Sequence, residues 1–167
     1  LAVGGGSVMD TAKLAGVLLD GSSTVHDLLE APGRAKKCCP TLMIPTTAGT
    51  GSEVDAWGVI SNPETNEKIG FGGDDRLFPV LALVDPQLML TVPPQYTAYQ
   101  GFDALFHSTE VHIGKFSNGV SDMFTKAAIE AIAAYLPRAV ADGNDLEARS
   151  KVAFANTMSG YAMVVAS

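Results

Sequence analysis

The possible folds of this chain are limited first by its opening stretch, LAVGGGSVMDTAKLAGVLL, in which an apolar run enters consecutive glycines. After Ser7 the apolar spacing becomes helical, at Val8, Ala12, Leu14, Ala15, Leu18 and Leu19, which predicts a strand, a glycine turn and a helix. Glycines let backbone amides approach an anion, and a helix N-terminus adds partial positive charge. The turn is therefore either a pyrophosphate site or simple turn chemistry, since it lacks the G-x-G-x-x-G pattern.

A second loop of small and hydroxyl residues, PTTAGTGSE, follows the short apolar run TLMIP, which has the length of a buried strand. Because ligands bind at the carboxyl edge of a parallel sheet, this loop and the glycine turn could converge there. The loop supplies hydroxyl donors from Thr46, Thr47, Thr50 and Ser52. An ordinary polar loop remains the alternative at this point.

The remainder of the first half predicts further strands. AWGVIS reads as a strand, NPETNEK as a turn that leaves Lys68 a solvated charge, and APGRAKK at 31–37 as a loop. The continuous apolar run PVLALVD is typical of a strand covered on both faces. Strands alternating with loops and a helix indicate an α/β layer structure with a parallel sheet.

The character of the sequence changes near TVPP, residues 91–94. Three Ala-rich stretches beyond it show helical periodicity: 93–113, 121–140 and 145–165. We therefore predict two domains, an α/β domain over 1–92 and an all-helical domain over 93–167.

The segment GFDALFHSTE places Asp103 and His107 four positions apart, on one face of a predicted helix. A carboxylate and an imidazole at this spacing suit two ligands of a divalent metal, and the alternative is a simple polar pair. Such sites need at least three protein ligands. His112 is a half-turn out of phase with Asp103 and His26 is remote, so further ligands are expected outside this chain.

Composition excludes some classes of function. A net charge of -7 with 11 scattered Lys and Arg residues argues against a nucleic-acid groove, and the apolar runs fall short of the roughly 20 residues of a spanning helix. Cys38 and Cys39 are adjacent and make a poor disulfide, which suits a reducing, cytoplasmic setting. The chain opens on Leu1 as though a strand had been cut, so we expect an excerpt of a longer protein.

Taken together, LAVGGGSVMDTAK, IPTTAGTGSEV and LVDPQLMLTVPPQYTAYQGFDALFHSTE closely resemble the middle portion of the iron-containing (group III) alcohol dehydrogenase family. The resemblance implies part of a Rossmann-like nucleotide-binding domain followed by part of an all-helical metal-binding domain, with the active site between them. The first strands and the end of the helical domain would be missing.

The resemblance also implies roles for individual residues. The glycine turn would hold the pyrophosphate of NAD or NADP, and the second loop would line the cofactor; the implied cofactor residues are Gly5, Gly6, Ser7, Asp10, Thr46, Thr47, Thr50 and Lys68. The family's metal ligands are one aspartate and three histidines, of which Asp103 and His107 match the first two. Asp55 departs from the family, where threonine is common. The residue that reads the adenine ribose would precede Leu1, so NAD and NADP are not distinguished.

The implied function is a metal-dependent oxidoreductase that transfers a hydride between a primary alcohol or diol, or the matching aldehyde, and NAD(P). The metal would be Fe(II), with zinc possible as in related glycerol dehydrogenases, and no side chain need act as nucleophile. The family likeness suggests a homo-oligomer. The competing interpretation is a non-catalytic nucleotide-binding or oligomer-forming fragment, and we expect the isolated chain to show little or no turnover.

Overall fold

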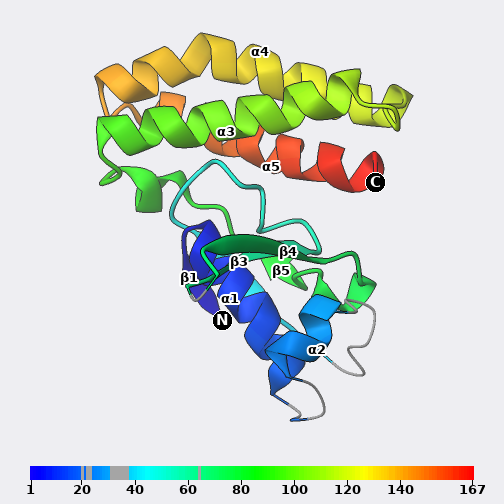
Figure 1. Cartoon of the computed structure of the whole chain (residues 1–167). Coiled ribbons are helices and arrows are strands. Elements are labelled where there is room, and N and C mark those ends of the chain that lie inside the picture. The colour runs from blue at the N-terminus through cyan, green and yellow to red at the C-terminus, as the bar shows by residue number, and fades with distance from the viewer. Residues whose placement is uncertain (20, 22–23, 31–37, 64) are drawn as a thin grey trace.

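The computed structural model of the protein describes residues 1–19, 21, 24–30, 38–63 and 65–167. Figure 1 shows three long helices stacked over a smaller part that contains the strands and two shorter helices. The loop expected at 31–37 lies outside the described residues. An α/β part followed by a helical part confirms the predicted fold class.

The central sheet has three strands, in the order β1 (Ala2–Gly4), β2 (Leu42–Pro45) and β5 (Leu81–Ala82). Both neighbouring pairs are parallel, which confirms the predicted parallel sheet. Gly4 lies opposite Pro45, so β1 and β2 end at the same edge. The helix α1 (Gly6–Leu18) leaves that edge directly after β1.

The expectation for the run PVLALVD was wrong in part. Only Leu81 and Ala82 form a strand, and Leu81 and Leu83 are 54% and 55% exposed instead of covered. β5 lies at the end of the sheet, where β2 is its only neighbour, and the described residues place no layer over these side chains. Apolar spacing reports which positions are hydrophobic, but it does not show whether a neighbouring layer covers them.

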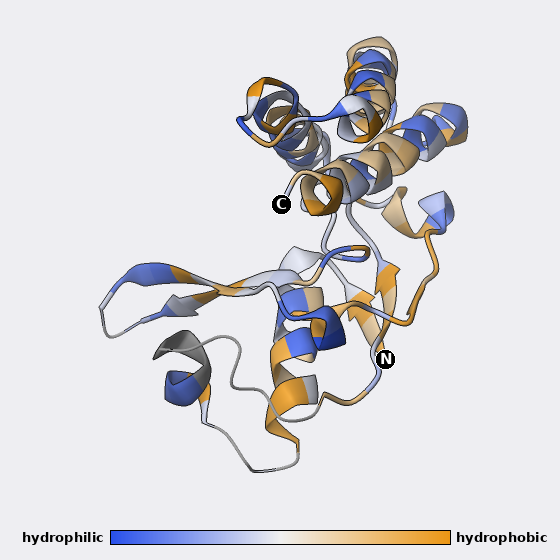
Figure 2. Cartoon of the chain, turned by 90° about the vertical axis from the view of Figure 1, so that its right-hand side faces the viewer, coloured by the Kyte–Doolittle hydropathy of each residue, from blue (hydrophilic) through white to orange (hydrophobic). Residues whose placement is uncertain are grey.

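A two-stranded antiparallel hairpin, β3 (Trp57–Asn62) and β4 (Glu67–Gly72), projects from the sheet part in Figure 2. The strand β3 was predicted, whereas β4 was not, because its two glycines hide the alternation of side chains. Asn66, with φ of 56°, turns the chain at this hairpin. Also unexpected were α2 (Val25–Glu30) and two short 3-10 helices, η2 (Asp75–Leu77) and η3 (Pro86–Met89).

The three predicted helices are α3 (Pro94–Ile113), α4 (Gly119–Ala141) and α5 (Leu146–Val165). Asn118 caps α4 by accepting hydrogen bonds from the backbone N–H groups of Val120 and Ser121. Small side chains on the facing surfaces let the helices approach closely. The core between them is formed mainly by Ala104, Ala128, Ile132, Leu136, Ala139, Ala148, Val152, Ala153 and Ala155.

Candidate cofactor and metal sites

The glycine turn (residues 4–7) and the hydroxyl loop (residues 46–53) meet at the carboxyl edge of the sheet. The backbone N–H of Thr46 donates to the carbonyl of Gly4 at 2.9 Å. A Cβ placed on Gly5 would lie 3.1 Å from Oγ1 of Thr47, and one on Gly6 would lie 2.7 Å from Cγ2 of Thr50. The predicted convergence of the two loops is confirmed, and the glycines are what allow it.

The start of α1 has the properties of an anion site. Its N-cap residue, Gly5, provides no side-chain hydrogen bond, and no acidic residue occupies the first turn. The first N–H groups of a helix have no partner within the helix, and they carry partial positive charge. Ser7 at this end is exposed. The turn therefore has the donors that a pyrophosphate group needs, and Gly6 must lack a side chain because Thr50 packs directly against it.

Asp10 serves a different contact from the one expected near the pyrophosphate. Its Oδ1 accepts from the hydroxyl of Ser52 at 2.6 Å, and its Oδ2 accepts from the backbone N–H of Val59 at 2.9 Å. One carboxylate on α1 thus holds both the hydroxyl loop and the hairpin.

Lys13 is a buried cation that the sequence reasoning missed. It is 0% exposed, and its Nζ lies 2.7 Å from Oδ1 of Asp55, 2.8 Å from Oγ of Ser52 and 2.7 Å from the carbonyl of Trp57. Burial raises the pKa of Asp55, and the charge of Lys13 opposes that rise. Lys13 and Asp55 thus form a buried ion pair that joins α1 to the segment before β3.

Lys68 lies apart from these contacts. It is exposed on β4, in register with Ser61 of β3. Among the described residues, no hydrogen bond or ion pair joins Lys68 to the glycine turn. Its place next to a cofactor remains a prediction.

Asp103 and His107 face each other on α3, with Oδ1 and Nε2 3.5 Å apart. Two ligands at about 2.1 Å from one tetrahedral ion lie about 3.4 Å apart, so the pair has the separation that shared ligation requires. The two side chains are 46% and 30% exposed, so an ion can reach them. Within the described ranges no cluster of three or more His, Cys, Asp or Glu residues could complete such a site.

The other histidines do not join this pair. Nδ1 of His112 lies 3.0 Å from the hydroxyl of Thr125 and 3.2 Å from Oδ1 of Asp122, both on α4. His26 is in α2, in the lower part of the molecule in Figure 1. Their exclusion from the metal pair agrees with the sequence reasoning.

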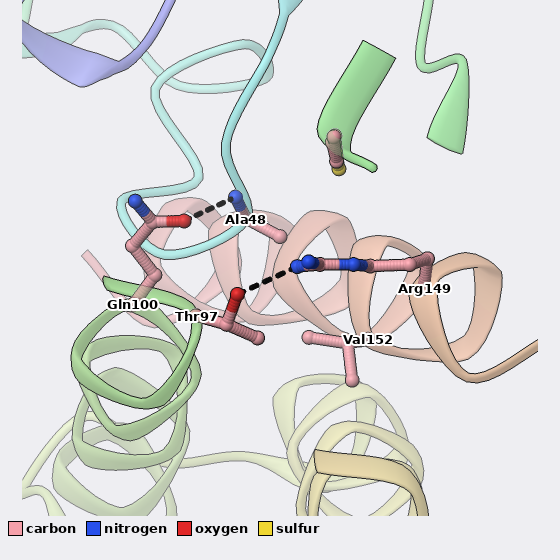
Figure 3. A pocket seen from close by; sticks show the side chains of 6 residues that line it. Ala48, Thr97, Gln100, Arg149 and Val152 are labelled. Carbon is pink, nitrogen blue, oxygen red and sulfur yellow. Dashed lines mark hydrogen bonds between the residues drawn. The ribbon is translucent and has the colours of Figure 1, made fainter. Parts of the chain in front are cut away.

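The hydroxyl loop also reaches the helix that carries the metal pair. The backbone N–H of Ala48 donates to Oε1 of Gln100 at 3.4 Å (Figure 3). Gln100 lies on α3, three positions before Asp103. Beside this contact, Arg149 donates to the hydroxyl of Thr97 at 2.7 Å and to the carbonyl of Val92 at 2.9 Å. Burial lowers the pKa of Arg149.

Two cavities lie near this junction, and neither is lined by the glycine turn or the metal pair. The cavity in Figure 3 measures about 10 Å³, room for about one water molecule. A wider hollow of about 230 Å³ opens between the segment after β5 and α5. Its lining residues are Val84, Pro86, Ser150, Ala153, Phe154 and Thr157.

The chain combines two features: a parallel sheet whose first strand enters a helix through a glycine turn, and a helical part that bears an Asp–His pair. Together they define a class of Rossmann-like nucleotide-binding proteins. Comparison with known families narrows this class. Residues 1–86 match the iron-containing alcohol dehydrogenase family, and residues 97–167 match the C-terminal domain of the Fe-containing alcohol dehydrogenase family. The chain belongs to the iron-containing alcohol dehydrogenase family.

Individual relatives agree with this assignment. The chain is 44% identical over 163 residues to a choline dehydrogenase of Bacillus subtilis, covering 96% of this chain and 40% of the relative. It is 38% identical over 162 residues to the NAD-dependent methanol dehydrogenase of Bacillus methanolicus, covering 97% and 42%. The chain therefore spans about two fifths of the length of these curated relatives.

Solved structures show the same fold. A sulfoacetaldehyde reductase from Bifidobacterium kashiwanohense, in complex with NAD+, superposes with a TM-score of 0.90 at 37% identity, covering 96% of this chain and 43% of that one. An iron-containing alcohol dehydrogenase from Thermotoga maritima gives a TM-score of 0.88 at 34% identity, covering 98% of this chain and 44% of that one.

In the part of the chain that the structure describes, no helix has both the length and the apolarity to cross a membrane.

Proposed function

We propose that the protein containing this chain is a metal-dependent oxidoreductase, which transfers a hydride between a primary alcohol or diol, or the matching aldehyde, and NAD(P). The observation that carries the proposal is the continuous contact from the glycine turn, through the hydroxyl loop, to the helix with Asp103 and His107. The NAD-dependent methanol dehydrogenase and the NAD+ complex among the relatives support this reaction class.

The cofactor residues of the proposal lie at the sheet edge. Backbone amides of Gly5, Gly6 and Ser7 would bind the pyrophosphate, because the start of α1 is uncapped. The hydroxyl loop would line the cofactor through Thr46, Thr47 and Thr50. Asp10 would fix the position of that loop through Ser52, and Lys68 would lie toward the rim of the site.

Asp103 and His107 would hold the metal, proposed to be Fe(II), with zinc the alternative. A divalent ion supplies Lewis acidity toward the substrate oxygen when it is bound. The protein's own contribution is positional: α3 aligns a carboxylate and an imidazole on one face, and Gln100 fixes the same helix to the hydroxyl loop.

A second candidate is a nucleotide-binding or oligomer-forming fragment without turnover. It is favoured by one observation, the lack of a third potential ligand near Asp103 and His107 in the described residues.

We also propose that the protein is a cytoplasmic homo-oligomer. Exposed aromatic side chains on α3, such as Phe102 and Phe106 at 51% and 60%, give an apolar surface for a second copy to cover.

The proposal is tested by steady-state assays of the full-length protein with NAD+ or NADP+ and a panel of primary alcohols and diols. The protein would be stripped with chelator and reloaded with Fe(II) or Zn(II). We expect absorbance at 340 nm to rise only after metal is restored. Binding of NAD(P) without turnover under every metal condition would favour the second candidate.

A further inference from the structure

A buried contact ties the hydroxyl loop to α5. Glu53 and Asn156 are 1% and 2% exposed, although they are 103 positions apart in the sequence. The amide of Asn156 makes two bonds to the loop: Nδ2 donates to Oε1 of Glu53 at 2.9 Å, and Oδ1 accepts from the backbone N–H of Gly51 at 3.0 Å. The hydroxyl of Thr157 donates to the same oxygen of Glu53 at 3.0 Å.

One turn further along α5, the loop and the helix touch through their backbones. A Cβ on Gly51 would lie 2.8 Å from Cα of Gly160, and one on Gly160 would lie 2.6 Å from Cγ2 of Val54. Gly51 also has φ of +68°, a conformation that favours glycine. Gly51 and Gly160 thus let the loop approach the helix closely, with the side chain of Val54 packed beside them. The polar contact at Asn156 adds directional bonds that fix the register of the loop on the helix.

The other side of the same loop contacts the glycine turn and the helix α3, which carries Asp103 and His107. Thr47 and Thr50 pack over the glycine turn, while a Cβ on Gly49 would lie 3.0 Å from Cα of Gln100 on α3. A shift of the loop along α5 must therefore change its contact with the turn, with the metal helix, or with both.

We propose that Glu53 and Asn156 are positioning residues: they form a buried clamp that sets the spacing between the glycine turn and the Asp103–His107 pair. The predicted effect of the clamp on turnover rests on the proposed function. Its effect on the spacing of the two sites rests on the described contacts alone, and neither residue need touch substrate or cofactor.

The clamp is suited to an uncharged carboxyl group. Both side-chain donors reach Oε1 of Glu53, Oε2 has no partner in the described residues, and no Lys or Arg there forms an ion pair with it. Burial raises the pKa of Glu53 and so favours the uncharged form, and the hydrogen bond from Thr157 opposes only part of that rise. A glutamine offers the same accepting oxygen without charge, so Glu53→Gln should preserve the clamp and Glu53→Ala should abolish it.

The spacing is measurable without any catalytic assay. Spin labels at Thr11→Cys on α1 and Glu110→Cys on α3 occupy exposed positions on either side of the loop. With Cys38, Cys39 and every other native cysteine of the full-length protein replaced by serine, double electron–electron resonance gives the distance distribution between the two labels.

Asn156→Ala and Glu53→Ala should shift or broaden that distribution, and Glu53→Gln should leave it as in the wild type. Ile132→Val, a buried change within α4, controls for a loss of stability that does not involve the loop. Where the wild type turns over alcohol, Asn156→Ala should lower kcat by about 100-fold, as a misplacement near 1 Å can do, while Ile132→Val keeps kcat.

The outcomes separate the two claims. An unchanged distance distribution in folded Asn156→Ala and Glu53→Ala overturns the clamp, whatever the activity. A shifted distribution in a protein that oxidises no alcohol supports the clamp and counts against the proposed function. A shifted distribution with kcat within twofold of the wild type removes the catalytic consequence.

Discussion

Replacing Lys13 by methionine tests whether the buried network holds the α/β part together. The substitution keeps a long apolar stem but removes the ammonium group that contacts Asp55, Ser52 and the carbonyl of Trp57. Asp55 is then left buried without its cation, because the structure gives its side chain 6% exposure. Breaking a buried pair from one side costs about 3–5 kcal/mol.

Lys13→Met should therefore lower the free energy of unfolding of the full-length protein by about 3–5 kcal/mol. Urea unfolding can be followed by far-UV circular dichroism and by fluorescence of Trp57, the single tryptophan of residues 1–167. Trp57 adjoins the network, since its backbone N–H donates to Oδ1 of Asp55 at 2.9 Å.

The double variant Lys13→Met, Asp55→Thr removes both charges, and we expect it to be more stable than Lys13→Met alone, because no charge stays buried unpaired. Lys126→Met is the matched control: this lysine is 63% exposed and 3.8 Å from Asp122, and its loss should change little. A Lys13→Met protein as stable as the Lys126→Met control would refute the reasoning.

Three other changes probe separate contacts. Asn118→Ala removes the cap of α4 and should lower the free energy of unfolding by about 0.5–2 kcal/mol, measured as a lower urea midpoint; an unchanged midpoint would contradict the capping role. Burial raises the pKa of Glu53 in the folded state, so the native state holds the proton of this carboxyl group more tightly than the unfolded state does. The stability that this proton contributes is fully present below the unfolded pKa and is lost as pH rises through the folded pKa. Glu53→Gln should therefore gain stability relative to the wild type between acidic and neutral pH in thermal melts, and a constant difference across that range would count against a raised pKa. Gly6→Ala adds a Cβ 2.7 Å from Thr50 and should weaken NAD+ binding at least tenfold by titration calorimetry, whereas Gly70→Ala, with no atom within 4 Å of its added Cβ, should not; equal affinities would remove the glycine turn from the cofactor site.

Local pattern was sufficient for α1, the three long helices and the glycine turn, but not for the short helix α2. The helices α3, α4 and α5 follow from apolar periodicity, which depends only on near neighbours in the sequence. The meeting of the glycine turn with the hydroxyl loop followed from one topological rule, that parallel strands end at a common edge. The Asp103–His107 pair needed only the helical repeat.

Contacts between distant segments were beyond such reasoning. Lys13 bonds to residues 39 to 44 positions away, and Asn156 to residues more than 100 away. The available signal for the first network was Lys13, three positions after Asp10, together with Asp55, two positions after the end of the second loop. The two glycines of β4 concealed the hairpin, and the apolar run around β5 gave no information about the layer above it.

The most direct test of the central claim is the metal content of the full-length protein, measured by elemental analysis beside the variant Asp103→Ala, His107→Ala. The account predicts close to one iron or zinc per chain in the wild type and a loss of that metal in the variant, with the variant still folded by circular dichroism. Metal absent from both, or bound equally by both, would contradict a metal site at this pair and leave only its helical contact at 3.5 Å.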